Sequence, residues 1–155
     1  MTEQPDSSGV LLPPPVIYSL FLVVGVAIDY YWPTSLFEPL IQVIAGAGLL
    51  LASVVLFALA LREFTRAKTS LSVTRSTSKL VTTGPFRVSR NPIYLALNLF
   101  YTGIAVLGDL PWTLALVVPA GVTLKYAVVQ REEAYLEHKF GEDYRRYKAS
   151  VRRWI

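Results

Sequence analysis

The segment LIQVIAGAGLLLASVVLFALAL, residues 40–61, has no charged side chain and reaches the roughly 17–25 residues that a helix needs to cross a bilayer. Three other apolar stretches accompany it in the chain, at Val16–Trp32, Tyr94–Leu110 and Trp112–Val129. We therefore expect an all-α protein, a polytopic membrane helix bundle with about four transmembrane helices. An amphipathic helix is expected to follow the last of them.

The composition is typical of a small membrane protein. Of the 155 residues, 53% are hydrophobic and 17% are charged, and the mean hydropathy is positive. The chain has no cysteine and one histidine, His138, which excludes disulfides and thiolate chemistry and argues against a metal site. Any chemistry therefore has to come from carboxylates, hydroxyls, amides or a cofactor.

The basic residues are confined to two segments of the chain. All 15 lysines and arginines fall in two segments, 62–90 and 125–153, whereas the connections at 33–39 and around Asp109 contain none. The positive-inside rule then predicts that both basic segments lie in the cytoplasm. They do not form the patch of a soluble nucleic-acid-binding surface, so the expected partner is the lipid bilayer and no nucleic acid.

We divide the chain as one membrane domain, 1–155, with five parts. These are a flexible lead (1–15), a two-helix hairpin (16–61), a cytoplasmic loop (62–92), a second hairpin (93–129) and a cytoplasmic helical segment (130–155). In the last part a stripe of apolar residues has helical spacing, and Gly141 is expected to bend that helix. The stripe consists of Leu136, Phe140, Tyr144, Tyr147, Val151 and Trp154.

Two polar cassettes, Thr82–Tyr94 and Arg131–Leu136, adjoin apolar helix ends. Ionisable groups at membrane depth cost about 2.5–3.5 kcal/mol each, so their presence there argues for a buried polar pocket. Asn91 followed by Pro92 predicts a helix start, with Asn91 as the N-cap. The positive end of that helix would favour an anionic group such as an amino-acid carboxylate. Tyr94 would then face a ligand or lie at the membrane interface.

The adjacent Glu132 and Glu133 point about 100° apart on a helix, so at most one of them is expected to face a pocket. The other would pair with a basic residue or with water, and a solvated surface pair is an equally good reading. Arg131 is a candidate contact for an acceptor carboxylate or an interfacial anchor. Arg87 and Arg90 are interpreted first as anchors at phosphate level.

Four motifs, Leu80–Phe86, Arg90–Tyr94, Glu132–Leu136 and Phe140–Tyr147, follow one another with a characteristic spacing. Together they resemble the isoprenylcysteine carboxyl methyltransferase family of integral membrane enzymes, which is related to the phospholipid methyltransferases. The resemblance covers roughly the second half of the chain. It implies S-adenosyl-L-methionine as methyl donor, with S-adenosyl-L-homocysteine as product, and a lipophilic acceptor that enters from the membrane.

The candidate catalytic residues are Glu132, which the resemblance implies, and Arg131, which is a nearby cation and not a position carried over from the family. Glu132 would take a proton from an amine or thiol, or hold the donor, and Arg131 would contact an acceptor carboxylate. The cofactor-binding residues implied by the resemblance are Ser78, Lys79, Leu80, Val81, Phe86, Asn91, Pro92, Ile93, Tyr94 and Glu132.

Four positions depart from the family pattern, one of which is Ala96 in place of a glycine. Asn91 replaces a histidine of the eukaryotic-type motif, Phe86 replaces a tyrosine, and Val128 stands where a substrate-contacting arginine is expected. Lys125 and Arg131 are then the nearest cations on that segment. The acceptor therefore stays open between a prenylcysteine carboxylate, a phospholipid amine and a thiol, and a non-enzymatic membrane assembly protein is the alternative from another class.

Overall fold

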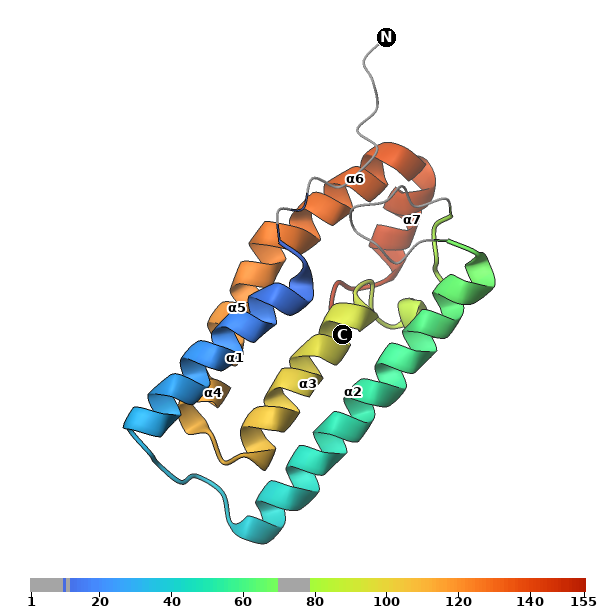
Figure 1. Ribbon diagram of the computed structural model, residues 1–155. Coiled ribbons are helices and arrows are strands. Elements are labelled where there is room, and N and C mark those ends of the chain that lie inside the picture. The colour runs from blue at the N-terminus through green and yellow to red at the C-terminus, as the bar shows by residue number, and fades with distance from the viewer. Residues whose placement is uncertain (1–9, 11, 70–78) are drawn as a thin grey trace.

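The computed structural model describes residues 10, 12–69 and 79–155, and within these ranges all regular structure is helical. The prediction of an all-α helix bundle is thus confirmed (Figure 1). In chain order the elements are α1 (Pro14–Tyr31), α2 (Pro39–Ala67), the 3-10 turn η1 (Gly84–Arg87), α3 (Pro92–Leu107), α4 (Pro111–Ala115), α5 (Val117–Leu124), the π turn η2 (Lys125–Val129), α6 (Gln130–Phe140) and α7 (Glu142–Ser150).

Proline begins the principal helices. Pro14, Pro39, Pro92 and Pro111 are the first residues of α1, α2, α3 and α4, and no N-cap side chain bonds the first turn of any of these four. Proline suits this position because its φ angle is already helical and its missing N–H would have no partner there. The helix starts are therefore fixed mainly by proline.

Helix α3 lies in the middle of the bundle, between α1 and α2 (Figure 1). The elements from α4 to α6 run on as one long rod, Pro111–Phe140, which packs beside α1. Close contact between α2 and α3 depends on small residues, since a Cβ on Gly46 would lie 2.7 Å from the backbone nitrogen of Leu107. Ser53 of α2 also donates a buried hydrogen bond of 2.8 Å to the carbonyl of Ala96.

Among the described residues, three helices are long and apolar enough to cross a membrane, namely α1, α2 and the rod Pro111–Phe140. Helix α3 has 16 residues, or about 24 Å at 1.5 Å per residue, which is shorter than the roughly 30 Å hydrocarbon core. All four predicted apolar stretches are helical, and three of the helices meet the length for a full crossing. The protein is an integral membrane protein.

Two aspartates hold the bundle together at the end where α1 stops and α2 starts. Asp29 accepts hydrogen bonds from the backbone N–H groups of Trp112 (3.0 Å) and Thr113 (2.9 Å), and so caps the start of α4 from another helix. Asp109 accepts the backbone N–H of Leu36 at 2.9 Å and ties the α1–α2 connection to the α3–α4 turn.

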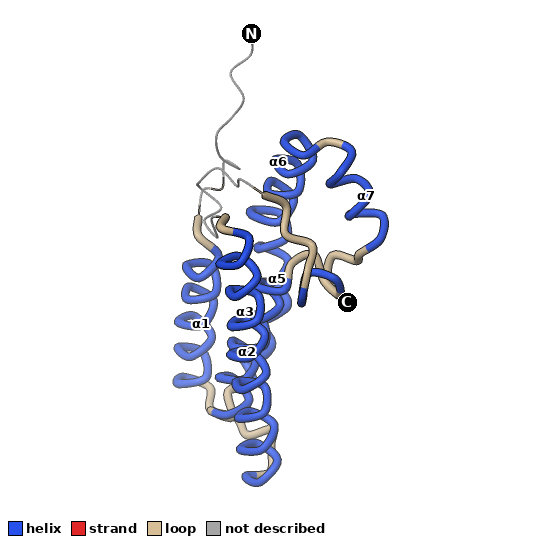
Figure 2. Tube along the Cα trace, turned by 90° about the vertical axis from the view of Figure 1, so that its right-hand side faces the viewer, coloured by secondary structure: helices blue, strands red, loops and turns tan. Residues whose placement is uncertain are grey.

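The structure corrects two predicted boundaries. Helix α2 continues to Ala67, beyond the predicted end at residue 61. The predicted helical stripe breaks at Gly141, whose φ is +54°, and α7 ends at Ser150. The prediction that the helix continues through Trp154 is therefore wrong. Val151 is extended, and the last residues return toward the start of α3, as Figure 2 shows.

Candidate active site

A cavity of about 310 Å³ lies at the end of the bundle where α1 and α3 begin. Its walls come from the amino end of α1, from α2, η1 and the first turns of α3, and from one residue of α6. The lining residues are Pro13, Pro14, Pro15, Phe57, Phe64, Phe86, Arg90, Asn91, Pro92, Ile93, Tyr94, Leu97 and Glu132. A mostly apolar cavity with a few convergent polar groups is typical of a small-molecule site.

The two glutamates of α6 point in different directions. Glu132 lines the cavity and accepts a hydrogen bond of 2.7 Å from the Tyr94 hydroxyl of α3. Glu133 is buried on another face of the helix. The π turn Lys125–Val129 immediately precedes this part of the rod, and such turns occur frequently at functional sites.

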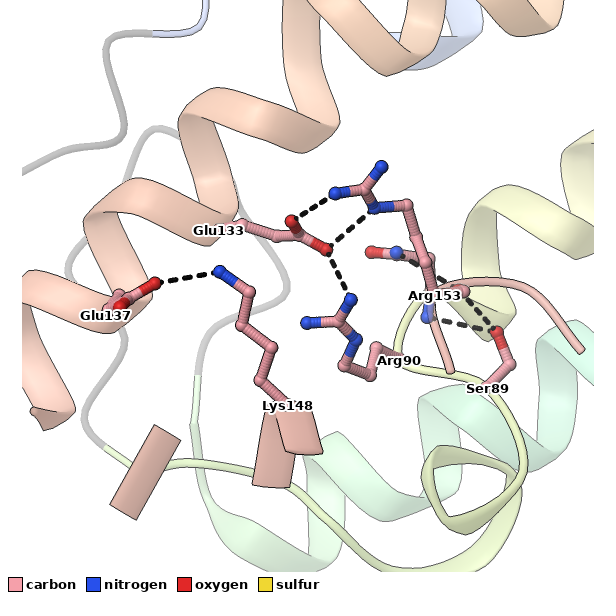
Figure 3. Close-up of polar contacts among 7 residues, drawn as sticks. Ser89, Arg90, Glu133, Glu137, Lys148 and Arg153 are labelled. Carbon is pink, nitrogen blue, oxygen red and sulfur yellow. Dashed lines mark hydrogen bonds and ion pairs between the residues drawn. The ribbon is translucent and has the colours of Figure 1, made fainter. Parts of the chain in front are cut away.

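Glu133 is shared by two arginines from distant parts of the chain. Arg153 donates to both of its oxygens, from Nε at 3.0 Å and from Nη2 at 2.7 Å, which is a bidentate pair. Arg90 Nη2 lies 3.2 Å from Glu133 Oε1, the oxygen to which Arg153 Nε also donates. The Arg90 and Glu133 side chains are each 8% exposed. Figure 3 shows the two guanidinium groups on either side of the carboxylate.

The carboxyl-terminal segment 151–155 is fastened to the start of α3. The carbonyl of Arg153 accepts hydrogen bonds from Ser89 Oγ (3.0 Å) and Asn91 Nδ2 (3.3 Å), and the backbone N–H of Arg90 donates to the Arg152 carbonyl at 3.0 Å. We call residues 151–155 the terminal strap. It covers the residues that form one wall of the cavity.

Helix α7 is anchored to the same wall. The Tyr147 hydroxyl donates to the Phe86 carbonyl at 2.7 Å, and burial raises the pKa of Tyr147 to about 12. At neutral pH the hydroxyl therefore keeps the proton that it donates. Burial likewise raises the pKa of Tyr144, which packs in the same apolar cluster as Phe86.

Six of the predicted site residues line the cavity: Phe86, Asn91, Pro92, Ile93, Tyr94 and Glu132. Leu80 and Val81 lie instead in the cluster that contains Phe86 and Tyr147, and Lys79 is exposed. Ser78 lies outside the described residues. Asn91 takes the predicted N-cap position of α3, but its side chain bonds the Arg153 carbonyl and makes no capping hydrogen bond to the first turn.

Two arginine interpretations change with the structure. Arg131 is exposed and is not among the residues that line the cavity, so its predicted place beside an acceptor is not seen. Arg90, interpreted from sequence as an interfacial anchor, is a buried wall of the cavity. The sequence signal for Arg90 was its position directly before Asn91-Pro92, the helix start.

Other wall residues escaped the sequence analysis. Phe57 and Phe64 are seven residues apart, which places them on one face of α2, but nothing in an apolar helix distinguishes that face in advance. Pro13–Pro15 were assigned to a flexible lead. Arg153 is not among the lining residues but pairs with Glu133, and nothing in the sequence except its charge indicated this contact.

The residues that line the cavity have side chains suited to the chemical groups of S-adenosyl-L-methionine. Glu132 suits an ammonium or ribose group, and Arg90 with the positive end of α3 suits a carboxylate. Phe64 and Phe86, whose ring centroids are 5.4 Å apart, offer aromatic surface for a purine. Within the described ranges no group of three histidine, aspartate or glutamate residues is arranged to hold a metal.

These features define a helical membrane protein with a mostly apolar cavity, which a few polar groups also line, at one end of its bundle. Comparison with known proteins gives the family. The model of the phospholipid methyltransferase family matches residues 41–143, and the chain belongs to that family. This agrees with the resemblance to membrane methyltransferases in the sequence, and membership supports a membrane methyltransferase.

One relative is an uncharacterized protein of Haemophilus influenzae, 67% identical over 27 residues. The match covers 17% of this chain and 43% of the length of that protein. No solved structure matches the chain.

Proposed function

We propose that the protein is an S-adenosyl-L-methionine-dependent methyltransferase that acts on a lipophilic acceptor in the 310 Å³ cavity. The observation that carries the proposal is the meeting of Glu132, Tyr94 and the start of α3 in one cavity. All three lie within the segment that matches the phospholipid methyltransferase family.

When bound, the donor would supply a methyl group on a positively charged sulfur. The nucleophilic atom of the acceptor would bond to the methyl carbon in line with the carbon–sulfur bond that breaks, and S-adenosyl-L-homocysteine would be the leaving group. The protein has little covalent chemistry to perform, so positioning of the reactants and exclusion of water account for most of the acceleration. Tyr94 holds the Glu132 carboxylate by a hydrogen bond. Phe57, Phe64 and Phe86 contribute to an apolar wall, which is a poor environment for water.

The acceptor that the cavity favours is an amine or a thiol. Val128, where the family resemblance implies an arginine for a substrate carboxylate, is fully buried in an apolar cluster. Lys125 lies 5.0 Å from the ring centroid of Tyr126, and Arg131 is outside the cavity. An amine or thiol has to lose a proton, and Glu132 is the carboxylate among the described lining residues that would take it.

A lipophilic tail has a route into the apolar part of the bundle. A second cavity of about 120 Å³ between α1 and α3 shares Pro15 and Leu97 with the first one. Its other walls include Tyr18, Leu22 and Phe100, which continue toward the middle of the helices. The concentration of basic residues in segments 62–90 and 125–153 supports a cytoplasmic position for the 310 Å³ cavity.

Cofactor binding is tested by thermal unfolding of the detergent-solubilised protein with and without S-adenosyl-L-homocysteine. Ligand at 100 times its dissociation constant adds about 2.7 kcal/mol to the unfolding free energy. We expect stabilisation in the wild type, a much smaller one in Glu132→Gln, and a wild-type response in Glu142→Gln, which is exposed on α7. A well-folded wild type that shows no shift would favour a non-enzymatic assembly protein.

The acceptor is tested by incubating the protein with methyl-labelled donor and separate pools of membrane aminolipids, lipophilic thiols and a prenylcysteine with a free carboxylate. We expect label in the aminolipid or thiol pool. Label confined to the prenylcysteine would refute the argument from Val128 while leaving methyl transfer itself intact.

A further inference from the structure

The Arg90 guanidinium has hydrogen-bond donors that meet no acceptor among the described residues. Its Nη2 meets Glu133, but Nε and Nη1 are buried and have no hydrogen-bond partner among the described residues. A buried donor without a partner costs about 1–3 kcal/mol, and more when the group is charged. Arg90 also lines the cavity, so an anionic group of a ligand bound there would give these donors a partner.

The charges around Arg90 lead to the same conclusion. Two guanidinium groups, those of Arg90 and Arg153, share the carboxylate of Glu133, so this ion cluster by itself has one positive charge in excess. The neighbouring carboxylate of Glu132 bonds the Tyr94 hydroxyl instead. Two residues on, Pro92 begins the 16-residue helix α3, whose first-turn N–H groups lack carbonyl partners within the helix. The helix end and the ion cluster thus both favour a negatively charged group at this wall.

We propose that Arg90 binds the carboxylate of the amino-acid end of the methyl donor, and that Arg153 of the terminal strap is the positioning residue that keeps Arg90 available for it. This inference rests on the proposed function. Arg153 occupies both oxygens of Glu133, so Glu133 cannot neutralise Arg90 by a bidentate pair of its own. The ammonium group, which is bonded to the same carbon as the carboxylate, would then lie toward Glu132.

The strap also fixes Arg90 through the backbone. The Arg152 carbonyl accepts the N–H of Arg90, and the Arg153 carbonyl accepts donors from the residues on either side, Ser89 and Asn91. Residues 89–91 are therefore held from one side by the strap and continue into α3 on the other. Figure 3 shows Arg153 reaching from the strap across to Glu133.

The test compares two ligands that differ only in the carboxylate, S-adenosyl-L-homocysteine and its decarboxylated analogue, by calorimetric titration of the full chain in detergent. We expect the wild type to bind the first at least tenfold more tightly, because hydrogen bonds to charged groups contribute about 1.5–3 kcal/mol. In Arg90→Gln this preference should fall to near one. In Arg153→Gln it should fall to threefold or less, with Arg153→Lys in between because it keeps the charge and loses the bidentate geometry.

The ratio of the two affinities separates a positioning role of Arg153 from a role in fold stability alone, since general loosening of the fold weakens the binding of both ligands. Arg153→Gln leaves Arg90 and Glu133 as a one-to-one pair, so the variant is expected to fold. Arg146→Gln is the matched control, because Arg146 pairs with Asp143 on the exposed face of α7, and it should keep the wild-type ratio.

Equal binding of the two ligands by the wild type would overturn the assignment of Arg90 to the carboxylate. A wild-type ratio in both Arg153 variants would overturn the role of Arg153. Binding of neither ligand by a folded wild type would instead refute the proposed function itself, so the two failures are distinguishable.

Discussion

Replacing Glu133 by glutamine should destabilise the protein, whereas the same replacement at its neighbour Glu132 should not. Glu133 is the common counterion of Arg90 and Arg153, and its side chain is 8% exposed. Removing one partner of a buried ion pair costs about 3–5 kcal/mol, because the remaining charge stays buried. Taking the lower figure, and about 2–4 °C per kcal/mol for a chain of this size, the melting temperature should fall by about 6–12 °C.

Glu132→Gln removes a charge of the same kind one residue away. Its amide oxygen can still accept the hydrogen bond from Tyr94, and no ion pair to Glu132 is formed among the described residues. We expect a melting temperature within about 2 °C of the wild type and loss of most of the stabilisation by S-adenosyl-L-homocysteine. Thermal unfolding of both variants in one detergent, with and without ligand, measures all four values.

The contrast between the two variants is what tests the reasoning. Equal losses of stability at both positions would mean that the two glutamates do not have the separate environments described here. Retained ligand stabilisation in Glu132→Gln would remove that residue from the binding site.

Two further predictions concern the scaffold. Gly46→Ala should lower the free energy of unfolding by about 1–3 kcal/mol, because the new Cβ would meet the Leu107 backbone. Gly48→Ala should change it little, since a Cβ there would have nothing within 4 Å. Thermal unfolding of the two variants measures the difference. For Asp109, the hydrogen bond from Ser35 and then that from the Leu36 N–H hold the carboxyl pKa below its usual value. Its contribution to stability is therefore complete above the ordinary pKa of about 3.9 and is lost as the pH falls through the lower folded pKa. Asp109→Asn should be less stable at neutral pH and should show less of this acid-dependent loss in melting curves recorded from pH 7 to pH 3.

Local sequence patterns predicted the parts of the site that depend on helix geometry. The divergence of Glu132 and Glu133 follows from 100° per residue, which any helix imposes. The start of α3 at Pro92 follows from the fixed φ of proline. The apolar stretches gave the helices, though not their ends, because α2 continues to Ala67 through charged residues that the hydropathy pattern had placed in a loop.

The contacts that local patterns could not predict are those between distant residues. The Arg90–Glu133 and Arg153–Glu133 pairs join three segments that have no periodic relation to one another. The strap was read as helix because Val151 and Trp154 continue a spacing of three and four residues. In the structure the carbonyls of Arg152 and Arg153 accept donors from residues 89–91, which a continued helix would not offer, and tertiary hydrogen bonds override the helical pattern.

The division of the site between segments has a consequence for how its charge is controlled. Arg90 and Glu133 lie inside the segment 41–143 that matches the phospholipid methyltransferase family, whereas Arg153 lies beyond it. Within the matched segment alone the two charges cancel. The terminal strap supplies the second guanidinium, and with it the excess positive charge of the cluster that Arg90, Glu133 and Arg153 form. If Arg90 binds a carboxylate as proposed, the affinity of this cavity for that group depends on a residue outside the part of the chain that identifies its family.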